Sequence, residues 1–314
     1  MRHLSKAVHL LVFIIIVALA FDINHNPFFV SEFPAISTSM SAEDPLYQEI
    51  QEKSRELAEK PQDAYIDQVW HKTPGRNGLE VDIQASYEKM KEKGSYDEAL
   101  LEYKQIPPAT KLKDLPASPI YRGHPDKEMV AFLINVSWGT EHIPDILRVL
   151  KENNVKATFF IEGKWAKENA GYVKMIHEQG HVVGNHAYNH PDMRKLSSGD
   201  IAEQISRTND IIKATIGISP EWFAPPSGNY TDEVVRTAHQ MEMETILWTV
   251  DTIDWKNPSV SVMINRVNDR IHRGATILMH PTPAIVEGLE PLIKNIKGRG
   301  YKIDTIDKLL REER

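Results

Sequence analysis

The run MVAFLINVSWG, residues 129–139, decides the fold of this chain. Val130–Val136 is apolar at every position except Asn135. A short apolar run without polar alternation is typical of a strand that is buried on both faces of a parallel sheet. From this point onward, short apolar runs alternate with amphipathic ones, and this alternation predicts an α/β fold.

Seven strands and six helices are expected in this half of the chain. The expected strands are Val130–Val136, Ala157–Ile161, His181–Gly184, Glu221–Ala224, Thr245–Val250, Thr276–Met279 and Tyr301–Ile303. The expected helices are Ile143–Lys151, Trp165–Gln179, Ser198–Ala214, Asp232–Gln240, Val260–Arg273 and Ile285–Gly298. So many strand–helix units favour a closed or partly closed barrel over a small open sheet.

Turn-forming residues divide the chain before this barrel. The Pro-rich stretch 107–125 marks a boundary, so we expect a barrel over residues 127–314 and a small N-terminal α/β or helical region over residues 45–126. We interpret that region as a structural spacer. Its expected elements are a helix over Pro45–Glu59, a strand over Leu79–Ile83 and a helix over Ile83–Met90.

The first residues have the pattern of an export signal. Arg2, His3 and Lys6 precede the apolar run Ala7–Phe21, and Ala18-Leu19-Ala20 offers a small-x-small cleavage site. The apolar run is shorter than the ~20 residues that a spanning helix needs, which favours a cleaved signal peptide over an anchor for residues 1–20. Residues 21–44 are interpreted as a linker, and the protein is expected to be secreted or held at the outer face of a bacterial cytoplasmic membrane.

The composition limits the possible partners. The net charge is −7 and no basic run with interleaved aromatics occurs, so the chain as a whole is not expected to bind polyanions or nucleic acid. Any membrane contact is expected only through the N-terminal segment. The chain has no cysteine, which excludes disulfides and leaves His, Asp and Glu as possible metal ligands.

Polar residues follow several of the expected strands. In a parallel barrel, the residues after the carboxyl ends of the strands share one mouth. The residues at these positions are Ser137-Trp138-Gly139, His186 and His190, Pro225-Pro226-Ser227-Gly228, Asp251, Asp254-Trp255, and His280.

His186 and His190 are the strongest signal among them. Their spacing would suit one face of a helix, but Pro191 disfavours helical backbone at His190, so a loop is predicted. Two neutral imidazoles within reach of each other favour a shared cation or a shared proton donor. Two solvated loop histidines are the alternative interpretation.

The blocks VKATFFIEG, HVVGNHAYNHPDM, APPSG, WTVDTIDW and ILMHP follow one another in this order. Together they resemble the NodB-type polysaccharide deacetylases, carbohydrate esterase family four, over Met129–Leu310. The resemblance implies a distorted seven-stranded (β/α) barrel. It also implies removal of N-acetyl groups from peptidoglycan or chitin-like glycan, and a bacterial exported or sporulation-associated protein.

The resemblance assigns a role to each matching residue. His186 and His190 match the two histidine metal ligands, and His280 matches the general acid. Asp254 and Trp255 match the residues that orient this acid and line the groove. Within Pro225-Pro226-Ser227-Gly228, Pro226 is expected to line the site and the Ser227 N–H to hold the oxyanion.

Three positions depart from the family pattern, in which the first motif is Thr-Phe-Asp-Asp-Gly. Ser137 stands where the family has its general base, and Trp138 stands where it has an aspartate ligand. Ala224 replaces the arginine that orients the base. A buried arginine without its carboxylate would be costly, so the loss of both groups together is coherent. We expect Trp138 to fill part of the site.

Other residues are candidates for supporting roles. A replacement carboxylate could come from Glu141, Asp192 or Asp251, each of which also has an ordinary structural role available. Trp222, Trp248 and Trp255 are candidate groove aromatics, although single tryptophans commonly belong to the core.

Three hypotheses follow for the function. The chain is a deacetylase with a rearranged site, a catalytically impaired member that binds acetylated glycan, or an envelope scaffold protein. The expected cofactor is a divalent metal (zinc, cobalt or nickel) that is bound weakly or not at all, since two histidines alone make a poor site.

Overall fold

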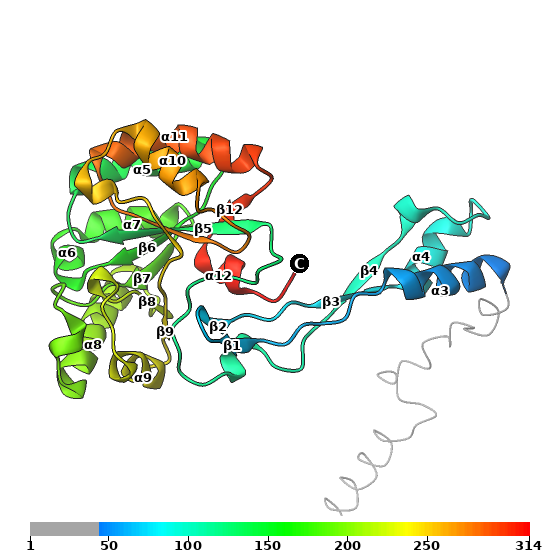
Figure 1. Cartoon of the computed structure of the whole chain (residues 1–314), viewed down its shortest axis with the longest axis horizontal. Helices are drawn as coiled ribbons and strands as arrows, with labels where there is room; N and C mark the ends of the chain where they lie inside the picture. The colour runs from blue at the N-terminus through cyan, green and yellow to red at the C-terminus, as the bar shows by residue number, and fades with distance from the viewer. Residues whose placement is uncertain (1–43) are drawn as a thin grey trace, which may run out of the picture. The chain divides into compact units, whose positions relative to one another are not determined.

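The computed structural model describes residues 44–314 (Figure 1). The predicted signal peptide or anchor and residues 21–43 of the predicted linker lie outside the described residues. Within residues 44–314, no helix combines the length and apolar character needed to cross a bilayer. The described residues form two compact units, which we call the inserted unit (44–57 and 81–102) and the barrel unit (58–80 and 103–314). The predicted boundary near residue 126 stays a prediction.

The inserted unit is built from two helices, α3 (Pro45–Leu57) and α4 (Ile83–Met90), which pack against each other. The Asp82 side chain caps α4 by accepting a hydrogen bond from the Ala85 N–H at 3.0 Å. The unit has its own small core, formed by Leu46, Ile50, Val81 and Met90.

The barrel unit contains one eight-stranded, all-parallel sheet, with strand order β10-β11-β5-β6-β7-β8-β9 and β12 paired to β5. Its strands are β5 (Met129–Val136), β6 (Thr158–Ile161), β7 (Val182–Asn185), β8 (Trp222–Phe223), β9 (Glu244–Thr245), β10 (Val250–Asp251), β11 (Thr276–Met279) and β12 (Lys302–Asp304). The sheet curls into a half-barrel, which confirms the predicted fold.

Helices alternate with these strands. They are α5 (Ile143–Glu152), α6 (Gly163–Glu168), α7 (Ala170–Glu178), α8 (Ser198–Ile216), α9 (Asp232–Gln240), α10 (Val260–Asn268), α11 (Pro283–Gly298) and α12 (Ile306–Leu310). Helix α11 packs on α5 and α10, and α8 packs on α6, α7 and α9 (Figure 1).

Strand β5 lies at the centre of two apolar cores, as its unbroken apolar sequence predicts. Phe132 and Ile134 belong to the larger core, beneath the helices. Ala131 and Leu133 point into a second core on the other face, which also contains Ile120. Both faces of the strand are therefore buried.

Two predicted elements are divided in the structure. The single strand expected over Thr245–Val250 is wrong, because β9 pairs with β8 while β10 pairs with β11 at the other edge of the sheet. The chain crosses the opening of the barrel between them. The helix expected over Trp165–Gln179 is interrupted at Asn169, whose backbone is not helical.

Before β5, the chain of the barrel unit forms a short extension of the sheet at its β9 edge. Here β1 (Tyr65–Asp67) pairs with β2 (His71–Thr73), and β3 (Gly78–Val81) pairs with β4 (Tyr103–Ile106). Ile120 forms a parallel bridge with Ile246 next to β9 and an antiparallel bridge with His71. The extension, formed by β1, β2 and Ile120, thus covers the β9 edge of the sheet.

A buried ion pair fixes the extension in place. Lys72 is fully buried, and its ammonium contacts the Glu244 carboxylate at 2.5 Å. Removing one partner of such a pair would leave an uncompensated buried charge, so the pair specifies where β2 lies on the barrel.

Candidate functional site

The carboxyl ends of the strands open into one pocket of about 440 Å³, which we call the mouth pocket. It brings together nine of the residues that the sequence analysis singled out and two others, Asn135 and Leu278. The lining residues are Ser137, Trp138, His186, His190, Ser227, Trp255 and His280, with Asn135, Trp248, Asp251 and Leu278.

Asp254 lies fully buried beneath this pocket and is well bonded. Its carboxylate accepts hydrogen bonds from the hydroxyls of Thr252 and Thr282, at 2.6 and 2.9 Å. It also accepts the backbone N–H of His280 at 3.1 Å and contacts His280 Nδ1 at 3.2 Å. Because the carboxylate can only accept, Nδ1 carries the proton of the neutral ring and Nε2 keeps its lone pair. A general acid must carry a proton on Nε2, so His280 could donate only in its imidazolium form, with the Nδ1–H still bound to Asp254.

Trp138 stacks on the ring of His280. The two ring centroids are 6.0 Å apart and the planes differ by 7°. Trp138 remains 47% exposed. The position where the family has a metal ligand therefore carries an aromatic side chain that packs against the predicted general acid. The size of Trp138 had predicted only that it fills part of the site.

Gly139 allows this loop to lie close to the segment after β11. Its φ is +73°, and a Cβ added to it would lie 2.0 Å from the Pro281 carbonyl oxygen. A residue with a side chain would clash here as well as strain the backbone. The absence of a side chain at Gly139 thus lets the loop after β5 pack directly against the segment after β11.

His186 and His190 lie in a loop after β7, and Ala187 and His190 adopt positive φ. His186 is buried, and its Nδ1 donates to the Ala224 carbonyl at 2.7 Å, which leaves the Nε2 lone pair available. Burial, followed by repulsion from His190, lowers the pKa of His186 to about 3. The two rings meet edge to face, with centroids 5.1 Å apart.

The residues after β8 take different positions. Ala224 is buried and supplies the carbonyl that holds His186. Ser227 lines the mouth pocket in a backbone conformation with φ +56°. Pro226 is buried and lies outside the pocket lining, so its predicted contact with the groove is not seen.

The donor set does not fit a divalent metal. Zinc sites in proteins use three or four protein ligands, and the family pattern supplies an aspartate at position 138. Within residues 44–314, no group of three or more His, Asp and Glu side chains has a geometry that could hold a metal ion. His186 and His190 alone provide two neutral imidazoles.

Of the three candidate replacement carboxylates, only Asp251 reaches the mouth pocket. It accepts the Ile253 N–H at 2.8 Å, and burial raises its pKa. The Glu141 side chain is 73% exposed, with His142 as its neighbour at 3.7 Å. Asp192 is occupied by an ion pair with Arg194 at 2.9 Å.

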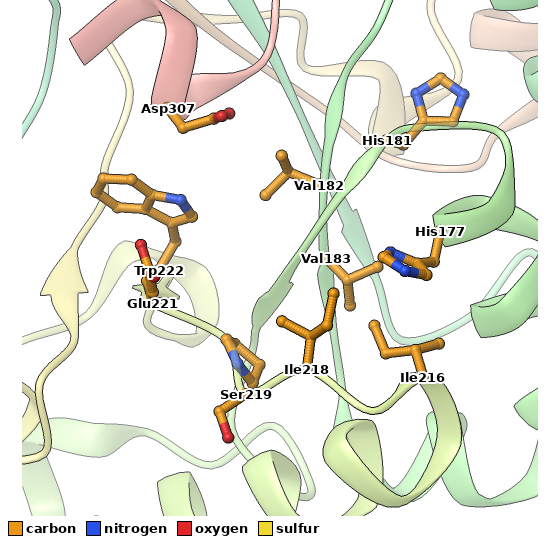
Figure 2. A pocket seen from close by; sticks show the side chains of 11 residues that line it. His177, His181, Val182, Val183, Ile216, Ile218, Ser219, Glu221, Trp222 and Asp307 are labelled. Carbon is orange, nitrogen blue, oxygen red and sulfur yellow. The ribbon is translucent and has the colours of Figure 1, made fainter. Parts of the chain in front are cut away.

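Two of the three candidate groove aromatics line the mouth pocket, namely Trp248 and Trp255. The third, Trp222, lies beside a different pocket together with His181 and Asp307 (Figure 2). His181 precedes β7 whereas His186 follows it, so this second pocket lies at the opposite end of the strand. The prediction for Trp222 is wrong because the residue enters β8 rather than leaving it.

Two polar residues of the site were not predicted. Asn135 is 4% exposed, lines the mouth pocket, and its Oδ1 has no hydrogen-bond partner among the described residues. Glu162 follows β6 and is buried, and this burial raises the pKa of its carboxyl. The nearby Ser137 hydroxyl opposes the rise, although its Oγ makes no hydrogen bond of normal geometry. A lone polar residue within an apolar strand was the available signal for Asn135.

The sequence profile of the polysaccharide deacetylase family matches residues 122–246. The chain is 47% identical to "Uncharacterized protein YlxY" of Bacillus subtilis, over 99% of this chain and 98% of that protein. It is 33% identical to a peptidoglycan-N-acetylglucosamine deacetylase of Bacillus cereus, over 60% of this chain and 70% of the enzyme.

Among solved structures, BA3943 of Bacillus anthracis, described as a CE4 family pseudoenzyme, matches with a TM-score of 0.81 and 49% identity. The match covers 86% of this chain and 96% of BA3943. A BA3943 mutant described as having restored enzymatic activity matches with the same TM-score and 48% identity. The chain belongs to the polysaccharide deacetylase family, carbohydrate esterase family four.

Proposed function

We propose that this protein binds N-acetylated cell-wall glycan in the mouth pocket and does not deacetylate it by the mechanism of its family. The stack of Trp138 on His280 carries this proposal. The side chain at the family's ligand position is an indole, which cannot coordinate a metal through its N–H. No base stands at Ser137. Asp254 and His280 are retained, but no group at positions 137 and 138 activates a water molecule for the reaction.

The same donor set leads us to propose that zinc, cobalt or nickel binds weakly or not at all. His186 and His190 supply two ligands, and a conventional site needs at least one more. Metal analysis of the untagged protein after purification in micromolar zinc tests this point. A stoichiometric metal would overturn it.

Binding of glycan is supported by the character of the pocket walls. Trp138 and Trp255 are 47% and 52% exposed and both line the pocket, so each offers an apolar ring face to a ligand. Asn135 Oδ1 and Ser137 Oγ lack partners within the described residues. Buried polar atoms normally have partners, and the hydroxyls or acetamide N–H of an acetylated sugar would supply the missing hydrogen bonds.

Isothermal titration with N-acetylated chito-oligosaccharide and with peptidoglycan fragments tests the proposal. Trp138→Ala and Trp255→Ala are each expected to weaken binding by roughly tenfold, since the loss of an aromatic contact in a pocket has this order of effect. Tyr103→Ala is the matched control, because Tyr103 is similarly exposed at 41% and lies outside the pocket.

Acetate release from the same ligands, with and without added zinc or cobalt, separates the alternatives. None is expected from the unsubstituted protein. Release at a rate that depends on His280 would favour the rearranged deacetylase. Complete absence of glycan binding would favour the envelope scaffold.

We also propose that the protein is exported and acts at the outer face of the cytoplasmic membrane or beyond it. The charged and apolar pattern of residues 1–20 supports export, and the named relatives include a peptidoglycan deacetylase. Fractionation of cells that carry the full chain tests this. Cytoplasmic retention would overturn it.

A further inference from the structure

A cleft of about 520 Å³ at the opposite end of the barrel is strongly basic. Arg273 precedes β11, Met129 opens β5 and Lys302 opens β12, so the cleft lies at the amino ends of strands whose carboxyl ends form the mouth pocket. We call it the basic cleft. Its lining residues are Arg76, Asp126, Lys127, Glu128, Met129, Arg273, Gly300, Lys302, Lys308, Arg311, Glu313 and Arg314.

Ion pairing neutralises only part of this charge. The three carboxylates of the cleft each have an arginine partner, at 3.9 Å for Arg76–Asp126, 2.6 Å for Arg273–Glu128 and 3.9 Å for Arg311–Glu313.

Arg314 is paired with Glu59 at 2.5 Å. Two exposed ammonium groups, those of Lys302 and Lys308, then remain without a carboxylate partner among residues 44–314. The half-buried Lys127 ammonium makes no ion pair either, but it is bound to backbone carbonyls and attracted by Glu312 and Glu313. A chain with a net charge of −7 thus gathers two free positive charges in one cleft.

The cleft is also held in shape. Lys127 Nζ donates to the backbone carbonyls of Lys308 and Arg311, at 2.8 and 2.7 Å, and so fixes the end of α12. Arg314 Nε donates to the Asn77 carbonyl at 2.8 Å. The backbone that carries the free ammonium groups is therefore positioned before any ligand arrives, and concave surfaces of one charge concentrate ions of the opposite sign.

We propose that the basic cleft binds a ligand that carries two or more phosphate groups. Several lysine ammonium groups beside arginine side chains are the usual protein partners of phosphate, and a phosphate brings more negative charge per group than a carboxylate. The lining contains no aromatic side chain on which a base could stack, so a nucleic acid strand would gain nothing beyond its phosphates.

The test uses the full chain and inorganic pyrophosphate as the probe, measured by isothermal titration at two salt concentrations. Lys302→Glu/Lys308→Glu is expected to weaken binding at least roughly tenfold, with a smaller loss at high salt where the attraction is screened. Both lysines are exposed, so the fold should persist, and circular dichroism checks this. Lys302→Ala/Lys308→Ala should give an intermediate loss.

The matched control is Lys167→Glu/Lys174→Glu. These lysines are exposed on α6 and α7, lie outside the cleft, and change the net charge by the same amount. If the two double variants lose affinity for pyrophosphate equally, the effect comes from overall charge, and the proposal is overturned.

Two further probes settle the class of ligand. A polyphosphate chain is expected to bind at least as tightly as pyrophosphate. Polyglutamate that binds as tightly at equal charge would overturn the assignment to phosphate, and an oligonucleotide that binds more tightly than polyphosphate would replace it with nucleic acid. Glycan binding in the mouth pocket should be unchanged in the Lys302→Glu/Lys308→Glu variant, so this inference and the proposed function fail independently.

Discussion

The two sides of the mouth pocket differ in how completely their polar groups are bonded. On the acid side, the buried carboxylate of Asp254 receives two hydroxyls, one backbone N–H and the His280 ring. On the base side, the Ser137 hydroxyl has no hydrogen-bond partner among residues 44–314, and Trp138 is half exposed. The acid side therefore helps to hold the fold together, whereas the base side can be substituted at little cost.

The largest effect is expected from Asp254→Ala. This change removes the acceptor of four buried or half-buried donors and should lower the free energy of unfolding by about 3–5 kcal/mol. Asp251→Ala is the matched control, since Asp251 accepts one backbone N–H and should cost about 1 kcal/mol. Urea unfolding measures both. Equal losses in the free energy of unfolding would show that the hydrogen bonds to Asp254 contribute no more to stability than the single bond to Asp251.

Restoring the base side should restore chemistry. Ser137→Asp/Trp138→Asp returns the family's base and ligand to a site that keeps Asp254, His280 and the histidine pair. Acetate release with added zinc should rise at least ~100-fold above that of the unsubstituted protein, because a general base that acts on a metal-bound water contributes about that much.

Ser137→Asp alone is the control for this gain, as it supplies a base without the ligand and should remain near background. If the double variant is folded and binds glycan but releases no acetate, the acid side keeps its geometry but does not support catalysis.

Gly139→Ala tests the junction between the two sides. Gly139 and Gly217 both have positive φ, +73° and +77°, but a Cβ at Gly217 meets nothing within 4 Å. Gly217→Ala should cost about 1–2 kcal/mol from backbone strain. Gly139→Ala should cost about 1–2 kcal/mol more because its methyl group overlaps the Pro281 carbonyl. Thermal unfolding compares the two, and equal costs would contradict the close contact.

The smallest effect is expected from Trp138→Ala on stability. The indole contacts His280 on one face and is otherwise 47% exposed, so its loss should cost roughly 0.5–1.5 kcal/mol. Urea unfolding measures this cost. A loss as large as that of Asp254→Ala would mean that the base side also supports the fold, and the contrast between the two sides would disappear.

Much of the barrel could be predicted because its elements are encoded locally. Val130–Val136 and Thr276–Met279 have the apolar sequence of buried strands, and Asp232–Gln240 was predicted with the bounds that the structure gives. The histidine loop followed from Pro191. Departures of Ser137, Trp138 and Ala224 were visible in the sequence because the family motifs fix their positions.

The remainder depends on contacts between distant residues. Nothing in Thr245–Val250 indicates that its two ends pair with opposite edges of the sheet. The burial of Lys72 against Glu244 joins residues 172 positions apart. Likewise, the parallel stack of Trp138 on His280 depends on the close approach of Gly139 to Pro281, which no local pattern specifies.

The clasp between Arg314 and Glu59 has a consequence for the order of folding. These residues are 255 positions apart, and Asn77 also donates its N–H to the Glu312 carbonyl at 2.7 Å. Contacts of such long range form late and slow the search for the native state. The stretch that carries Glu59 and Asn77 cannot be fully secured until residues 312–314 have been synthesised. A chain that stops before Glu312 would therefore hold this stretch loosely, and its tendency to aggregate should fall only once these residues are present.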